Sequence, residues 1–202
     1  MSEETNAQHA EAMRALKAER EELMKSKTLE KGLLLVHTGD GKGKSSAGFG
    51  MVARSLGWGM QVGVVQFIKG KWKTGERLFF SRFPDQVRYR VMGEGFTWDT
   101  QDRERDVAAA KAAWEESKAM IADPTLDFVL LDEINIALRY DYIDVNEVID
   151  FLKTEKPYMT HVVLTGRNAK EELIEIADLA TEMELLKHPF RSGIKAQQGV
   201  EY

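Results

Sequence analysis

Residues 38–46, with the sequence TGDGKGKSS, decide the fold class of this 202-residue chain. They follow a short apolar run at 33–36 and precede a predicted helix at 45–56. A glycine-rich turn between a buried strand and a helix is the setting of a phosphate-binding loop: backbone N–H groups surround phosphate oxygens, a lysine adds charge and a hydroxyl binds Mg²⁺. Thr38 stands where the usual G-x-x-x-x-G-K-[ST] pattern has glycine, so this loop is a variant.

Apolar runs alternate with helical patterns along the rest of the chain. Strands are expected at 62–67, 87–92, 128–131, 162–165 and 183–186. Helices are expected up to residue 122 from an N-cap at Asp99 or Thr100, up to residue 153 from a capping box of Asp144 and Glu147, and at 169–179. This alternation predicts an α/β fold of three layers: a mainly parallel sheet with helices on both faces, and a P-loop NTPase (RecA-like) core.

The first 31 residues differ in character from the rest. They are rich in Glu, Lys, Arg and Ala, and an apolar stripe at helical spacing favours one amphipathic helix; it contains Met13, Leu16, Arg20, Leu23 and Met24. We therefore expect a helical arm at 1–31 and a nucleotide-binding P-loop domain at 32–202, to which the resemblance given below adds corrinoid binding. The arm could be a solvated helix, or it could dock on a partner subunit or over a site.

Composition excludes several classes of function. The formal net charge of −5 argues against a salt-sensitive grip on nucleic acid, and the absence of cysteine excludes disulfides, thiolate zinc sites and a cysteine nucleophile. No apolar run approaches the roughly 18 residues of a membrane span, and no secretory signal is recognisable at the N-terminus. The expectation is a cytoplasmic protein that binds neither membrane nor nucleic acid.

The apolar run at 128–131 ends in Asp132 and Glu133, which is the form of a Walker B segment. Such acids hold a metal ion or activate a group. Loop and acids together predict a site for Mg²⁺ and a nucleoside triphosphate, but they do not select the reaction. Hydrolysis, phosphoryl transfer, nucleotide sensing and attack at the nucleoside end with triphosphate as leaving group all stay open.

Seven motifs together resemble the ATP:corrinoid adenosyltransferase family of the P-loop type. They are TGDGKGKSS at 38–46, VQFIKG at 65–70, GFTW at 95–98, LDE at 131–133, YDY at 140–142, TGR at 165–167 and GIKAQQGVEY at 193–202. The resemblance runs from about residue 32 to the end. The chain departs from the family at Asp40, where asparagine is usual, and at Ser45 and Ser46, where two threonines are usual.

The resemblance implies a reaction: a corrinoid reduced to cobalt(I) attacks C5′ of ATP, and inorganic triphosphate leaves. Lys44, Lys42 and Glu133 would be catalytic, and the two lysines would offset charge on the departing triphosphate. Mg²⁺ would be held by Ser45 and Glu133, with Asp132 close by. The residues expected to bind ATP are Gly39, Asp40, Gly41, Lys42, Gly43, Lys44, Ser45, Ser46, Arg54 and Arg167.

The resemblance also implies how the corrinoid is handled. Phe96 and Trp98 would face the corrin and displace the lower axial ligand, which makes cobalt(II) easier to reduce. Two aromatics spaced by two residues also fit one face of a core strand. The family further implies a homodimer, an N-terminal helix that can cover the active site, and an electron-donating flavoprotein as partner.

Two other functions stay open on the sequence alone. A P-loop phosphohydrolase or kinase would release phosphate or ADP, and it has no need of Phe96, Trp98 or the KAQ tail motif at 195–197. A non-catalytic carrier would bind nucleotide or corrinoid without turnover, and the presence of Lys44, Ser45 and Glu133 argues against it.

Overall fold

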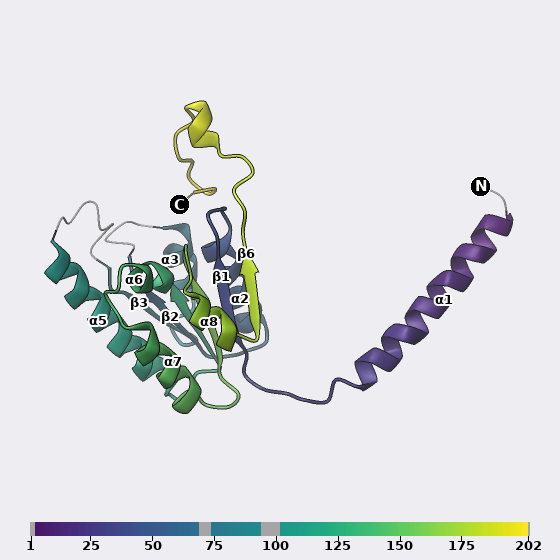
Figure 1. Ribbon diagram of the computed structural model, residues 1–202, viewed down its shortest axis with the longest axis horizontal. Helices are drawn as coiled ribbons and strands as arrows, with labels where there is room; N and C mark the ends of the chain where they lie inside the picture. The colour runs from purple at the N-terminus through teal and green to yellow at the C-terminus, as the bar shows by residue number, and fades with distance from the viewer. Residues whose placement is uncertain (1–2, 69–73, 94–101, 202) are drawn as a thin grey trace. The chain divides into compact units, whose positions relative to one another are not determined.

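The computed structural model describes residues 3–68, 74–93 and 102–201, and it divides into two compact units, 1–31 and 32–202 (Figure 1). The first unit contains one helix, α1 (Glu3–Lys25). The apolar side chains of its stripe are exposed, from 39% at Leu16 to 68% at Met24. A single helix cannot bury such a stripe by itself. Among the described residues, no helix is long and apolar enough to cross a membrane.

The second unit is built on a six-stranded sheet in the order β3-β2-β4-β5-β1-β6. Every strand pair in it is parallel, as the alternation of strands and helices predicted. The strands are β1 (Leu34–Thr38), β2 (Val62–Gln66), β3 (Val87–Val91), β4 (Phe128–Asp132), β5 (His161–Thr165) and β6 (Leu179–Glu182).

Helices cover both faces of this sheet and complete the three predicted layers (Figure 1). Alternate strand residues point to opposite faces, so Leu35 and Val163 pack in one core while Val36 and Val162 pack in the other. One face carries α2 (Lys44–Gly57) and α3 (Gly75–Phe80). The other carries α5 (Arg103–Ile121), α6 (Ile134–Arg139), α7 (Val145–Thr154) and α8 (Glu171–Ile176).

The last strand differs from the prediction. It runs over Leu179–Glu182 instead of 183–186, and α8 ends at Ile176, so the predicted helix at 169–179 was too long. The chain leaves the helix at Asp178, whose N–H donates to the Leu34 carbonyl and whose carboxylate accepts from the Leu34 N–H. These bonds fix the chain beside β1, and a short 3-10 helix, Pro189–Ser192, follows in the tail.

Two predicted helix starts also needed correction. Asp102 caps α5 by accepting from the N–H of Arg105 at 3.1 Å, whereas Asp99 and Thr100 lie outside the described residues. Asp144 does cap α7, but the reciprocal half of the capping box is missing. Glu147 instead accepts a hydrogen bond from Nε1 of Trp114 at 2.8 Å, which ties α7 to α5.

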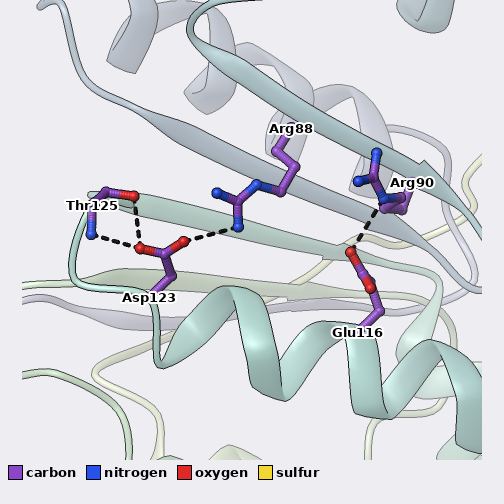
Figure 2. A network of polar contacts seen from close by, with 5 residues as sticks. All are labelled: Arg88, Arg90, Glu116, Asp123 and Thr125. Carbon is purple, nitrogen blue, oxygen red and sulfur yellow. Dashed lines mark hydrogen bonds and ion pairs between the residues drawn. The ribbon is translucent and has the colours of Figure 1, made fainter.

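Ion pairs fasten the edge strand β3 to α5 and to the turn that follows it (Figure 2). Arg88 donates to Asp123 at 2.9 Å, and Arg90 donates to Glu116 at 3.2 Å. Hydrogen bonds from Thr125, together with Arg88, lower the pKa of Asp123 to about 2. Charges on an edge strand also discourage pairing with another chain.

Buried His37 and half-buried His161 predict a loss of stability in mild acid. Both nitrogens of His37 are buried without a hydrogen-bond partner among the described residues, and burial lowers the pKa of its ring. Nδ1 of His161 accepts from the N–H of Leu33 at 3.0 Å, and burial with nearby Lys156 lowers the pKa of this ring as well. Both rings are therefore neutral in the folded protein at neutral pH.

Because both pKa values are depressed on folding, the unfolded chain binds protons first as the pH falls below about 6.5. The neutral rings contribute fully to the free energy of unfolding above that pH. This contribution is lost as the pH falls toward the pKa values of the folded state. We expect each histidine to add at most about 1.4 kcal/mol per pH unit to the slope of the free energy of unfolding against pH. Urea unfolding between pH 5 and 7.5 should give a shallower slope for His37→Phe than for the wild type; equal slopes would contradict the assignment.

Candidate active site

The predicted site segments meet at the carboxyl edge of the sheet. The order β4-β5-β1 places the ends of these strands side by side. The glycine-rich loop follows β1, Asp132 and Glu133 end and follow β4, and Arg167 comes just after β5. In open α/β sheets this edge is where ligands bind. The architecture therefore joins a loop and an acidic pair that are far apart in the sequence.

The loop turns at Gly39 and again at Gly43. Their φ angles of 93° and 112° lie in the left-handed region that favours glycine. Thr38 is still part of β1, and its Oγ1 accepts a hydrogen bond from the N–H of Ala169 at 3.0 Å. This explains the variant pattern, because the residue that must turn is Gly39 and position 38 needs no glycine.

The chain after β6 packs directly against the loop. The N–H of Gly41 donates to the carbonyl of Met183 at 2.6 Å. A Cβ atom on Gly39 would lie 2.4 Å from that same carbonyl oxygen, and one on Gly41 would lie 2.5 Å from the carbonyl of Glu184. These two glycines are therefore required by the packing of the loop itself, in addition to any contact with phosphate.

Lys44 is the centre of the site's electrostatics. It is 7% exposed, and its Nζ donates to the carbonyl of Gly41 at 2.5 Å. Burial lowers the pKa of Lys44, and the carboxylate of Glu133 acts in the opposite direction. Arg167, Asp40 and Lys42 also act on this ammonium group. The structure thus gathers four other predicted site residues within electrostatic reach of Lys44.

The two acids have different surroundings. Asp132 is fully buried and accepts hydrogen bonds from Nε2 of Gln66 at 2.9 Å and from Oγ1 of Thr165 at 2.8 Å. Glu133 adopts a left-handed φ of 65°, which costs a non-glycine residue about 1–2 kcal/mol. Its N–H donates to Oγ1 of Thr165 at 3.0 Å. Asp132 is anchored in the sheet, while Glu133 is held in a strained backbone conformation beside Lys44.

Comparison with known proteins identifies the family. Residues 30–202 match the family described as ATP:corrinoid adenosyltransferase BtuR/CobO/CobP. The chain belongs to the ATP:corrinoid adenosyltransferase family. The resemblance read from the sequence motifs is confirmed.

Relatives from three bacteria are each named corrinoid adenosyltransferase. A corrinoid adenosyltransferase of Sinorhizobium sp is 65% identical over all of this chain and 94% of its own length. One from Pseudomonas aeruginosa is 55% identical over all of this chain and 98% of its own. One from Escherichia coli K12 is 47% identical over 86% of this chain and 87% of its own.

One predicted ATP-binding residue of this adenosyltransferase, Arg54, lies away from Lys44 along α2. It is in the last turn of α2, whereas Lys44 is the first residue of that helix. Ten residues of helix separate the two, a rise of about 15 Å. The structure therefore does not bring Arg54 next to Lys44, and its contact with phosphate stays a prediction. Phe96 and Trp98 lie outside the described residues.

Three contacts of this adenosyltransferase were missed by reasoning from the sequence. Gln66 and Thr165 are the last residues of the buried strands β2 and β5, and a polar residue late in an apolar run was the available signal for the anchors of Asp132. Glu201 forms an ion pair with Lys42, which lies 159 positions earlier in the sequence. No local pattern announces that pair.

Proposed function

We propose that the protein transfers the 5′-deoxyadenosyl group of ATP to the cobalt(I) of a reduced corrinoid and releases inorganic triphosphate. The observation that carries this proposal is the family match over residues 30–202. The gathering of Lys42 and Arg167 around Lys44 supports it, because a triphosphate needs concentrated positive charge.

No protein side chain needs to form a covalent bond in this reaction. Cobalt(I) supplies the electron pair of the new cobalt–carbon bond, and the C5′–O5′ bond of ATP breaks, so that O5′ leaves with its pair on the triphosphate. The role of the chain is to hold the reactants in line and to offset the charge of the leaving group. Lys44 and Lys42 would perform the second task, with backbone N–H groups of residues 39–45.

The residues at the loop fit a magnesium ion. Ser45 supplies a hydroxyl and Glu133 a carboxylate, and Mg²⁺ prefers such oxygen ligands. Gly166 leaves room beside the carboxylate, since a Cβ there would lie 3.2 Å from Oε2 of Glu133. Among residues 3–68, 74–93 and 102–201, no group of three or more acidic or histidine side chains could hold a metal ion. This agrees with a metal held largely by phosphate oxygens and water.

Bound Mg²⁺ would supply charge neutralisation to the phosphates of ATP. Ser45 and Glu133 would hold it, and Asp132 would keep the strand end in place through Gln66 and Thr165. We expect Ser45→Ala to raise the Mg²⁺ concentration needed for half-maximal activity about tenfold, by loss of one ligand. Ser45→Thr, which keeps the hydroxyl, should behave as the wild type. An unchanged Mg²⁺ requirement in Ser45→Ala would remove Ser45 from the metal site.

The corrin-binding role of Phe96 and Trp98 is part of the same proposal. The segment that carries them begins after Gly93, whose N–H donates to the carbonyl of Gln66 at the carboxyl end of β2. It therefore starts from the edge of the sheet that holds the loop. We further propose a cytoplasmic homodimer whose corrinoid is reduced by an electron-donating flavoprotein.

An anaerobic assay with ATP, Mg²⁺ and chemically reduced cob(I)alamin tests the proposal. The expected products are light-sensitive adenosylcobalamin and triphosphate in equal amounts, and both should depend on the corrinoid. ADP and phosphate formed whether or not corrinoid is present would identify a P-loop phosphohydrolase instead.

A further inference from the structure

The C-terminal segment touches the phosphate loop at two separate points. The first is the backbone of Met183, which accepts the hydrogen bond from Gly41. The second is the carboxylate of Glu201, which pairs with the ammonium of Lys42. The tail thus leaves the loop after β6 and returns to it at the end of the described chain (Figure 1).

A turn presents Glu201 to the loop. The N–H of Glu201 donates to the carbonyl of Gln197 at 2.8 Å, and Gly199 adopts a φ of 80° within that turn. The Glu201 side chain is 14% exposed, whereas that of Lys42 is 57% exposed. Its hydrogen bond from Lys42 lowers the pKa of Glu201, so the carboxylate is ionised at neutral pH. The tail therefore places a negatively charged carboxylate at a loop that is predicted to bind anions.

A carboxylate and a triphosphate compete for the same ammonium group. Lys42 stands between the turn glycines of the loop, where the proposed function needs it to face phosphate. Because the Lys42 side chain is largely exposed, water screens its ion pair with Glu201, and a polyanion with several charged oxygens can displace the carboxylate. When the triphosphate leaves, the carboxylate can take its place. Glu201 then acts on both substrate binding and product release.

We infer that Glu201 is a positioning residue of the adenosyltransferase reaction: it holds Lys42, is exchanged for the triphosphate chain of ATP, and returns to Lys42 as inorganic triphosphate departs. This inference rests on the proposed function, since it takes the loop as the site of the triphosphate. It assigns a role in turnover to the end of the chain, far in sequence from the loop.

Glu201→Gln removes the competing charge and keeps the shape of the side chain. We expect it to bind inorganic triphosphate and ATP about two- to fivefold more tightly, the range set by the strength of an ion pair with a largely exposed lysine. In steady state the KM for ATP should fall, kcat should not rise, and inhibition by triphosphate should strengthen. Glu201→Asp should restore wild-type values. Glu175→Gln, the same change of charge at an exposed position in α8, should bind as the wild type does.

The decisive experiment is a double-mutant cycle read by calorimetric binding of inorganic triphosphate. Glu201→Gln should gain affinity in the wild-type background and gain nothing in a Lys42→Met background, because its effect passes through Lys42. Equal affinity of Glu201→Gln and wild type, or the same gain with and without Lys42, would overturn the inference. Loss of triphosphate binding in Lys44→Met would leave the proposed function standing even if the inference about Glu201 failed. Triphosphate binding that Lys44→Met does not affect would overturn the proposed function itself.

Discussion

Replacing Lys44 with methionine is expected to lower kcat/KM for ATP by about 10²–10³-fold, the usual cost of removing one group that stabilises developing negative charge. Lys44 is buried at the start of α2, and its Nζ donates to the carbonyl of Gly41. Methionine keeps the length of the apolar stem, so the packing of the helix should survive. The loss then reports the ammonium group alone.

Steady-state kinetics with reduced cobalamin measure this effect. Lys153→Met, at an exposed position in the last turn of α7, is the matched control, because α7 packs on the opposite face of the sheet from α2. It should keep wild-type kinetics. A Lys44→Met enzyme within a factor of three of the wild type would remove Lys44 from the catalytic machinery.

Gly39→Ala is expected to destabilise the domain by at least about 2–3 kcal/mol and to abolish measurable ATP binding. A left-handed backbone costs alanine about 1–2 kcal/mol, and the φ of Gly39 is 93°. The added methyl would also lie 2.4 Å from the carbonyl oxygen of Met183. Since the obstacle is backbone, either the loop or the chain after β6 must move.

Gly50→Ala provides the matched control for this substitution. Gly50 lies inside α2, and a Cβ atom there would meet nothing within 4 Å. Alanine should stabilise the helix by about 0.5–1 kcal/mol and leave ATP binding unchanged. Denaturant unfolding of the three proteins tests the pair. A Gly39→Ala domain as stable as the wild type would contradict the packing of the loop described above.

The central part of the fold was predictable because of how its strands are buried. β2, β4 and β5 are covered on both faces, so their apolar runs stand out in the sequence. All four residues of β6 are exposed, so no apolar pattern marks it. The six-residue helix α3 buries only Phe80, which leaves too little periodicity to detect. Short elements at the edge of the sheet depend on tertiary contacts that a local pattern does not show.

The candidate site likewise contains residues with a local sequence signature and residues brought in only by tertiary contacts. Lys44, Ser45 and Glu133 could be predicted because a loop and a strand end carry local signatures. Arg54 was assigned to the phosphates from the family resemblance, and the structure places it ten residues along α2 from Lys44. Glu201 lies 159 positions from Lys42. Only the folded chain brings that carboxylate to the loop, so nothing near either residue could have indicated the pair.

The tail and the loop form one structural element. Met183 and Glu184 limit the space around Gly39 and Gly41, while Glu201 neutralises Lys42. A change in the tail should therefore alter nucleotide binding without touching the nucleotide. This distinguishes the present loop from one whose glycines serve phosphate alone.

The central claim is that the protein breaks the bond between C5′ and O5′ of ATP. The most direct test uses ATP labelled with oxygen-18 at the 5′ bridging position, turned over with reduced cobalamin and followed by mass spectrometry of the products. Attack of cobalt on C5′ predicts that all of the label appears in inorganic triphosphate. Label retained on the nucleoside product would show that a phosphorus–oxygen bond is cleaved, and would contradict the account.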